Sequence, residues 1–122
     1  MIQILIAFAG GLGAVTRFVV DAQIGRRATS LGMPLGTATI NITGSLLLGF
    51  IVGWWSAHTG DPGLKLAIGT GFLGGYTTFS TASVEAARLA RAGQARRLVI
   101  HAGGRFLLSI VVAGLGIWLG TR

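Results

Sequence analysis

The sequence predicts an all-α membrane protein in which residues 1–122 form one unit with four transmembrane helices. Composition supports this, because 52% of the residues are hydrophobic and only 11% are charged, whereas a typical soluble domain has about 25% charged residues. Apolar stretches of near-transmembrane length also recur, each close to the roughly 20 residues that a helix needs to cross a bilayer. They are residues 2–20, 35–57, 64–89 and 98–119.

The first stretch, 2–20, has one feature of a cleaved signal peptide, since Ala7 and Ala9 form an A-x-A pattern. Signal peptides begin with basic residues, and the first three residues here include none. We therefore expect this stretch to remain as the first membrane helix. Residues 21–34 are expected to join it to the second helix, where Pro34 suits the first turn.

The second stretch, 35–57, alternates polar and apolar residues as a half-buried strand would. An open strand edge in lipid would leave backbone groups without partners, so we predict a helix. On a helix, Thr37, Asn41 and Ser45 share one face, while Thr39 and Thr43 share another. These polar faces are expected to meet protein or water.

The third stretch, 64–89, is rich in glycine and hydroxyl residues over 69–81. Glycine weakens a helix and hydroxyls compete for its backbone bonds, so we expect an unwound break between two half-helices. Such breaks occur at membrane depth where they are buried in protein or line a cavity, and their free backbone groups commonly bind ions. The alternative is that the small residues only allow neighbouring helices to approach closely.

Three motifs in these stretches resemble those of the CrcB, or Fluc, family of fluoride channels. They are Gly10-Gly11-x-Gly13-Ala14-x-x-Arg17, Gly36-Thr37-x-x-x-Asn41-x-x-Gly44 and Gly71-Phe72-x-Gly74-Gly75-Tyr76-Thr77-Thr78-Phe79-Ser80-Thr81. The third motif is highly specific, and the resemblance covers essentially the whole chain. It implies an antiparallel dimer of four-helix subunits with two fluoride pores and a structural sodium ion (Na+) at the centre of the interface.

Fluoride is small and strongly hydrated, so its pore must replace water with hydrogen-bond donors. Asn41 has two amide donors, and hydroxyl donors are carried by Thr39, Ser80, Thr81 and Ser109. The resemblance implies that Asn41 and the hydroxyls of the third stretch line the pore. The alternative for a lone asparagine in a membrane helix is a clamp between helices.

Phe79 matches the first of two phenylalanines that, in the family, present positively polarised ring edges to fluoride. The chain departs from the family at the second position, where it has Ala82. Gly74 and Thr77 match positions whose backbone carbonyls hold the family's sodium ion, and carbonyl oxygens suit a hard cation.

Three charged residues lie close to the predicted pore. The resemblance places Arg17 at an aqueous vestibule, although an arginine near a helix end could also extend to the lipid headgroups. Arg105 would make the pore wall more electropositive or pair with Glu85. Glu85 matches an acidic position in the family and would either gate the pore or form an ion pair with Arg88.

The net charge of +7 is distributed unevenly, in a way that favours a membrane protein over a nucleic-acid-binding one. The loops after the first and third helices share one side and carry six arginines: Arg26, Arg27, Arg88, Arg91, Arg96 and Arg97. The opposite side has Lys65 and Arg122. The positive-inside rule then places the arginine-rich loops in the cytoplasm and both termini outside the cell inner (plasma) membrane. Family members that insert in both orientations have nearly balanced loops, so this bias predicts a fixed orientation and a paralogous partner rather than a homodimer.

The leading functional hypothesis is a passive channel that exports fluoride and so relieves its toxicity. A non-conducting structural subunit that supports a partner stays open because of Ala82 and the charge bias. A small multidrug exporter would need a carboxylate within the first stretch, which has none. His58 and His101 stand apart from other metal-ligating residues, and we find no catalytic pattern, so the sequence predicts no enzyme.

Overall fold

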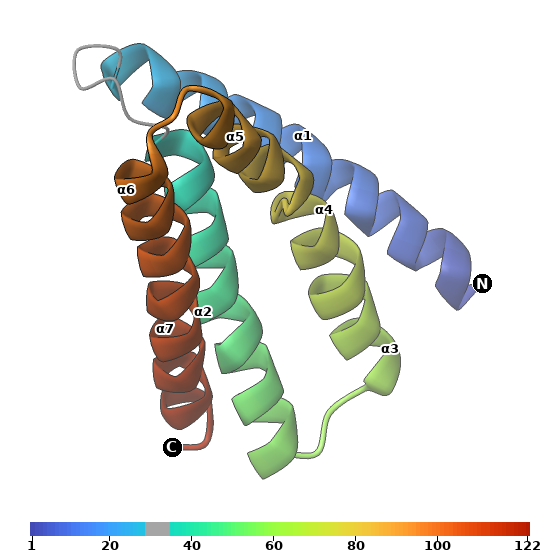
Figure 1. The fold of residues 1–122 in the computed structure, drawn as a ribbon. Coiled ribbons are helices and arrows are strands. Elements are labelled where there is room, and N and C mark those ends of the chain that lie inside the picture. The colour runs from blue at the N-terminus through green and yellow to red at the C-terminus, as the bar shows by residue number, and fades with distance from the viewer. Residues whose placement is uncertain (29–34) are drawn as a thin grey trace.

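A computed structural model describes residues 1–28 and 35–122 of the protein. Its elements, in chain order, are α1 (Ile2–Ala28), α2 (Leu35–Ala57), α3 (Pro62–Lys65), η2 (Leu66–Leu73), α4 (Gly74–Tyr76), α5 (Ser80–Arg91), α6 (Ala95–Leu98), η3 (Val99–Gly103) and α7 (Gly104–Gly120). The described residues contain no strand, and the elements form a bundle of long helices (Figure 1). The predicted all-α fold is confirmed.

Three continuous helical segments among the described residues are long and apolar enough to cross a membrane: 2–27, 35–57 and 95–120. The predicted stretch 64–89 does not qualify because its helix is interrupted. Large apolar side chains lie exposed along these helices, including Phe8, Phe18 and Val111. An exposed apolar surface of this extent is typical of a protein surrounded by lipid, so this chain is a membrane protein.

Helix α1 differs from its predicted extent, because it continues to Ala28 rather than ending at Val20. Residues 21–28, which were predicted to belong to the joint, continue the helix, and Arg26 and Arg27 lie in its last turn. Cationic side chains at that position interact favourably with the negative end of the helix dipole. The predicted place of Pro34 falls outside the described residues.

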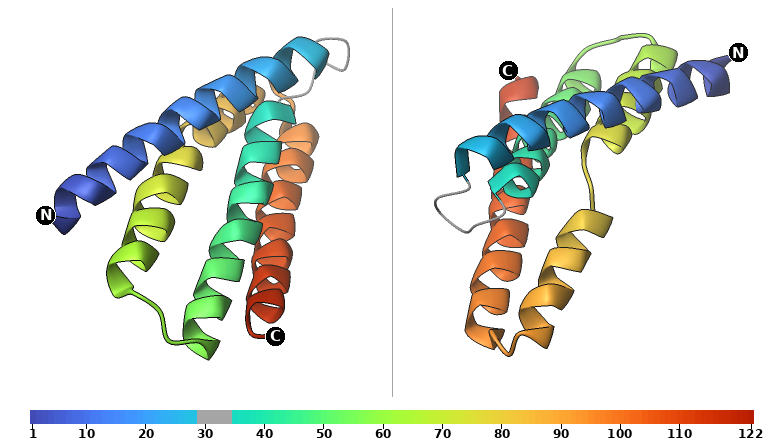
Figure 2. Two further views of the ribbon diagram at one scale, coloured as in Figure 1. Left: turned by 180° about the vertical axis from the view of Figure 1, so that it is seen from behind. Right: turned by 90° about the horizontal axis from the view of Figure 1, so that it is seen from above.

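Glycines allow the helices to pack with their backbones close together. A Cβ added at Gly53 of α2 would lie 2.3 Å from the Ile117 carbonyl oxygen of α7, and one at Gly116 of α7 would lie 2.3 Å from the Leu46 carbonyl oxygen. Figure 2 shows α2 and α7 side by side along their lengths. Small residues therefore set the distance between these two helices.

The sequence left two interpretations of the third span open, an unwound break and close packing through small residues. The structure contains both features. Gly75 packs so closely against α1 that an added Cβ would lie 2.1 Å from the Gly10 carbonyl oxygen. The helix then breaks at residues 77–79, where Thr77 has an extended backbone with φ −75° and ψ 159°. Glycine packing and an unwound break thus occur in succession along one span, and α5 leaves at an angle to α4 (Figure 2).

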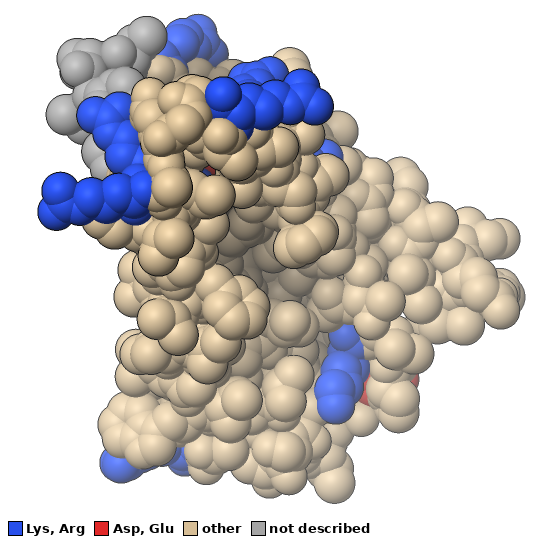
Figure 3. Space-filling model, in the orientation of Figure 1, with Lys and Arg blue, Asp and Glu red and all other residues tan. Residues whose placement is uncertain are grey.

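The two ends of the bundle have different chemistry. Pairs of arginines lie in the last turns of three helices at one end, α1, α5 and α6, as Figure 3 shows at its top. At the other end, Trp55 Nε1 donates to the Asp61 carbonyl, and the Arg122 guanidinium lies 4.1 Å from the Trp118 ring centroid. The uneven charge noted in the sequence is thus an end-to-end asymmetry of the folded chain.

Candidate ion pathway

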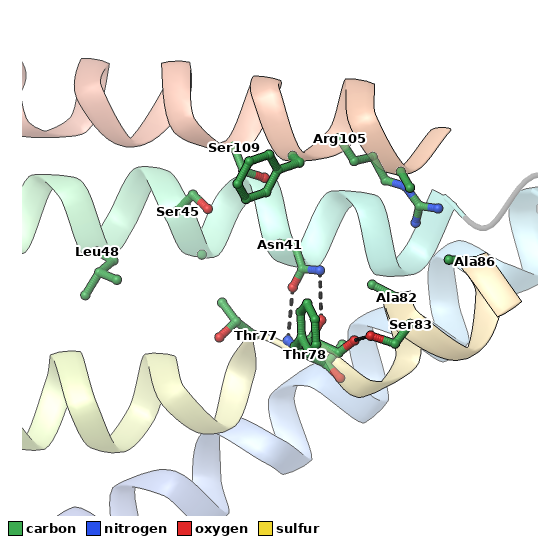
Figure 4. Close-up of a pocket in the computed structure, with 14 residues that line it drawn as sticks. Asn41, Ser45, Leu48, Thr77, Thr78, Ala82, Ser83, Ala86, Arg105 and Ser109 are labelled. Atoms are coloured by element: carbon green, nitrogen blue, oxygen red, sulfur yellow. Dashed lines mark hydrogen bonds between the residues drawn. The ribbon is translucent and has the colours of Figure 1, made fainter. Parts of the chain in front are cut away.

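A pocket of about 530 Å³ lies where the break in the third span faces α2 and α7 (Figure 4). Its polar lining comes from three parts of the chain: Asn41 and Ser45 on α2, Thr77, Thr78 and Ser83 on the third span, and Arg105 and Ser109 on α7. Apolar lining residues lie among them, including Phe79, Ala82 and Phe106. The pocket therefore combines hydrogen-bond donors, one cationic group and two aromatic rings within a membrane protein.

Asn41 is held at the break by two hydrogen bonds (Figure 4). Its Nδ2 donates to the Thr78 carbonyl at 2.9 Å, and the Thr78 backbone N–H donates to its Oδ1 at 3.0 Å. Asn41 thus clamps α2 to the third span and also lines the pocket, so the two roles considered for it are compatible. The amide has a second N–H, which gives Asn41 a further donor for a ligand.

Thr78 organises the start of α5. Its hydroxyl donates to Thr81 Oγ1 at 3.2 Å and accepts the Thr81 backbone N–H at 3.3 Å. Ser80 Oγ also lies 3.2 Å from the Thr78 hydroxyl. Ser80 and Thr81, two predicted pore residues, do not line this pocket. Their hydroxyl groups contact that of Thr78, which does line it.

Of the six predicted pore residues, Asn41, Phe79 and Ser109 line the pocket. Thr39 does not, and its hydroxyl instead donates to the Leu35 carbonyl at 2.8 Å. The reason is geometric, because positions two apart on a helix lie on different faces. The face that Asn41 shares with Ser45 is the one that meets the break.

The break frees backbone carbonyls of the third span from their helical partners. In a continuous helix the Thr78 and Thr81 amides would donate to the Gly74 and Thr77 carbonyls. Here those amides donate to the Asn41 side chain and the Thr78 hydroxyl instead. Gly74 is exposed, and among the described residues outside its own helical turn no atom lies within 4 Å of where its Cβ would be. Carbonyl oxygens in this state are suited to a hard cation such as sodium.

Arg105, which lines the pocket, forms an ion pair with Glu85 of α5. Arg105 Nη1 lies 2.8 Å from Glu85 Oε2, and both side chains are 17% exposed. Thr37, which is only 3% exposed, donates its hydroxyl to Glu85 Oε1 at 2.7 Å. Arg105 Nε also donates to the His101 carbonyl at 2.9 Å. Among the alternatives for Glu85, the structure shows a pair with Arg105 rather than with Arg88.

Arg17 is separate from this pocket. It lies on α1, and its Nε is buried without a hydrogen-bond partner among the described residues. The ion pair found among the described residues joins Glu85 and Arg105 and does not include Arg17, the third charged residue that the sequence singled out.

Several residues of the site were not assigned to it from the sequence. Thr37 and Ser45 could have been, because they share a helix face with Asn41. Ser83 and Phe106 carry no such signal, since only the fold brings α5 and α7 to the same pocket.

A family model described as CrcB-like protein, Camphor Resistance (CrcB), matches residues 4–121. The chain belongs to the CrcB-like family. One relative of this CrcB-like chain, from Leifsonia xyli subsp. xyli, is named Fluoride-specific ion channel FluC 1; it is 47% identical over 120 residues, which cover 98% of this chain and 87% of the relative. A second, from Cutibacterium acnes and named Fluoride-specific ion channel FluC 2, is 47% identical over 123 residues, which cover 100% and 99%.

A third relative of the CrcB-like chain, from Novosphingobium aromaticivorans and named Fluoride-specific ion channel FluC, is 40% identical over 120 residues, which cover 94% of this chain and 89% of the relative. The family is one of ion channels and not of enzymes. The resemblance seen in the sequence motifs is confirmed.

Proposed function

We propose that this CrcB-like chain is a subunit of a fluoride-selective channel that lets fluoride leave the cell passively and so relieves fluoride toxicity. The observation that carries the proposal is the pocket at the break, where amide, hydroxyl and guanidinium donors face aromatic rings. A dehydrated fluoride ion needs hydrogen-bond donors, and it is attracted to the positive edges of aromatic rings. The names of the relatives support the same ion.

In this proposal the ion passes between α2, the break and α7. Asn41 would supply a donor from α2 and Ser109 one from α7, and Phe79 would present a ring edge from the break. Arg105 adds positive potential, but its pairing with Glu85 limits how tightly it can hold an anion. A site that binds fluoride loosely enough to release it is what conduction requires.

A second subunit completes the proposed pore. Phe79 is 87% exposed in the single chain although it lies beside the polar break, so a partner surface is expected to cover it. An antiparallel arrangement would repeat the break across a two-fold axis and form two pores. The Gly74 and Thr77 carbonyls of both subunits would then supply four oxygens to a structural sodium ion at the interface.

The arginine-rich end is proposed to face the cytoplasm, with both termini outside the plasma membrane. Six arginines at this end against Lys65 and Arg122 at the other would fix the orientation of the chain. A chain with a fixed orientation needs an oppositely oriented paralogue to form an antiparallel pair, and relatives with numbered names are consistent with such paralogues.

A topology reporter fused to the C-terminus should be found almost entirely outside the cell. Equal populations on the two sides would contradict this orientation.

The test of the function is ion efflux from liposomes that contain the purified chain, alone or with its paralogue. Fluoride should leave the liposomes rapidly in at least one of the two preparations, while chloride should remain inside in both. Efflux from the mixture alone would favour the paralogous pair. An absence of fluoride efflux from both preparations, or chloride efflux as fast as that of fluoride, would refute the proposal.

A non-conducting partner subunit is the second candidate, and Ala82 in the pocket wall favours it because the wall there has only a methyl group. If this chain does not conduct, liposomes that contain both the chain and its paralogue would still release fluoride. Pore substitutions in this chain would then leave that efflux rate unchanged. A multidrug exporter is less consistent with the fold. The carboxylate that α1 gains by its extension, Asp21, lies beside Gly36 at the start of α2 and not at the middle of the helix.

A further inference from the structure

The α7 wall of the pocket contains an aromatic residue with no assigned role. Arg105, Phe106 and Ser109 of α7 line the pocket, together with Ala102 at the end of η3. Phe106 is 66% exposed in the single chain, so much of its ring surface remains available to a ligand or a partner. It lies between two polar lining residues of the same helix, Arg105 and Ser109.

The α5 wall of the same pocket is made of small residues. Ala82 and Ala86 contribute only methyl groups there (Figure 4), so the space next to them can accommodate a large side chain from another element. Phe106 is the lining residue of α7 large enough and apolar enough to use that space. The arrangement thus places small residues on one helix and a ring on the other.

A ring in this position has a specific effect on an anion. The edge of a phenylalanine ring carries partial positive charge, whereas an aliphatic side chain of similar size carries none. A ring edge can therefore stabilise fluoride without holding it as tightly as an ammonium or guanidinium group would. Phe79 offers such an edge from the break, and Phe106 can offer one from α7.

We propose that Phe106 is a conduction-determining residue, which supplies the second aromatic edge of the fluoride pathway from α7. The inference rests on the proposed function, and it assigns to Phe106 a role that depends on its aromatic ring and not on its size alone. It also predicts that a phenylalanine introduced at position 82 of α5 can replace the ring of Phe106, because residue 82 lines the same pocket.

The experiment measures fluoride efflux from liposomes that contain the conducting wild-type preparation or its variants. Phe106→Leu keeps an apolar side chain and should lower the efflux rate about tenfold, which corresponds to roughly 1.4 kcal/mol in the barrier. Phe8→Leu is the matched control, because Phe8 is 67% exposed but lies on α1 outside the pocket. Its efflux rate should stay within about twofold of wild type, as expected for a surface change remote from the site.

A second substitution separates the aromatic role from packing. Adding Ala82→Phe to Phe106→Leu should restore most of the lost efflux, because a ring again lines the pocket. Wild-type efflux in Phe106→Leu would overturn the inference and leave the proposed function intact. A loss that Ala82→Phe does not restore would show that Phe106 acts by packing, which also overturns the inference. An inactive wild-type preparation would overturn the proposed function, and this inference with it.

Discussion

Asn41→Asp is expected to reduce fluoride efflux at least about 100-fold, the largest effect of any single substitution in the pathway. The aspartate carboxylate cannot donate to the Thr78 carbonyl, so the clamp at the break is lost on one side. It also places a negative charge where the anion must pass. A charge at membrane depth costs roughly 2.5–3.5 kcal/mol, and about 1.4 kcal/mol corresponds to a tenfold change in rate.

Gln94→Glu is the matched control for this substitution. It makes the same change from amide to carboxylate, but at an exposed residue between α5 and α6, where the side chain accepts a hydrogen bond from Arg97. The efflux rate of this variant should equal that of wild type. Rapid fluoride efflux through Asn41→Asp would show that the ion does not pass Asn41.

Arg105→Leu is expected to destabilise the fold by about 2–3 kcal/mol, which is below the roughly 3–5 kcal/mol for a fully buried pair because these side chains keep some exposure. Among the described residues, the variant leaves the Glu85 carboxylate with the Thr37 hydroxyl as its hydrogen-bond partner. The free energy of unfolding in detergent, measured by titration with sodium dodecyl sulfate, tests this expectation.

A double variant identifies the cause of the loss. Combining Arg105→Leu with Glu85→Gln removes the unpaired charge and should recover most of the stability. Arg88→Leu, which affects the alternative partner of Glu85, should change the free energy of unfolding by no more than about 0.5 kcal/mol, since Arg88 is exposed. Equal losses in Arg88→Leu and Arg105→Leu would contradict the assigned ion pair.

The existence of the break could be predicted from the sequence because its signal is local. Glycines and hydroxyl residues weaken a helix wherever they gather. Its position at residues 77–79 could not, because it depends on Asn41, more than thirty residues earlier, which takes the Thr78 N–H away from the helix. The position of a break is thus decided by which backbone groups find better partners outside their own helix.

The candidate site shows the same division. The polar face of α2 follows from helical periodicity, which correctly groups Asn41 with Ser45. Thr39 was included for its hydroxyl alone, although the same periodicity places it on another face. The Glu85–Arg105 pair was one of the alternatives that the sequence offered, but choosing it required the arrangement of α5 beside α7. The place of Phe106 depends on the same arrangement, which no sequence spacing encodes.

The central feature of the proposed channel is an interrupted third span whose backbone groups act as ion ligands. Solid-state NMR of the conducting preparation in bilayers, with carbonyl and amide labels in this chain at Gly74, Thr77 and Thr78, tests this most directly. We predict a non-helical carbonyl shift at Thr77, a response of the Gly74 and Thr77 carbonyls when potassium replaces sodium, and a response of the Thr78 amide to fluoride but not to chloride. Helical shifts throughout residues 74–85, with no response to either exchange, would contradict the account.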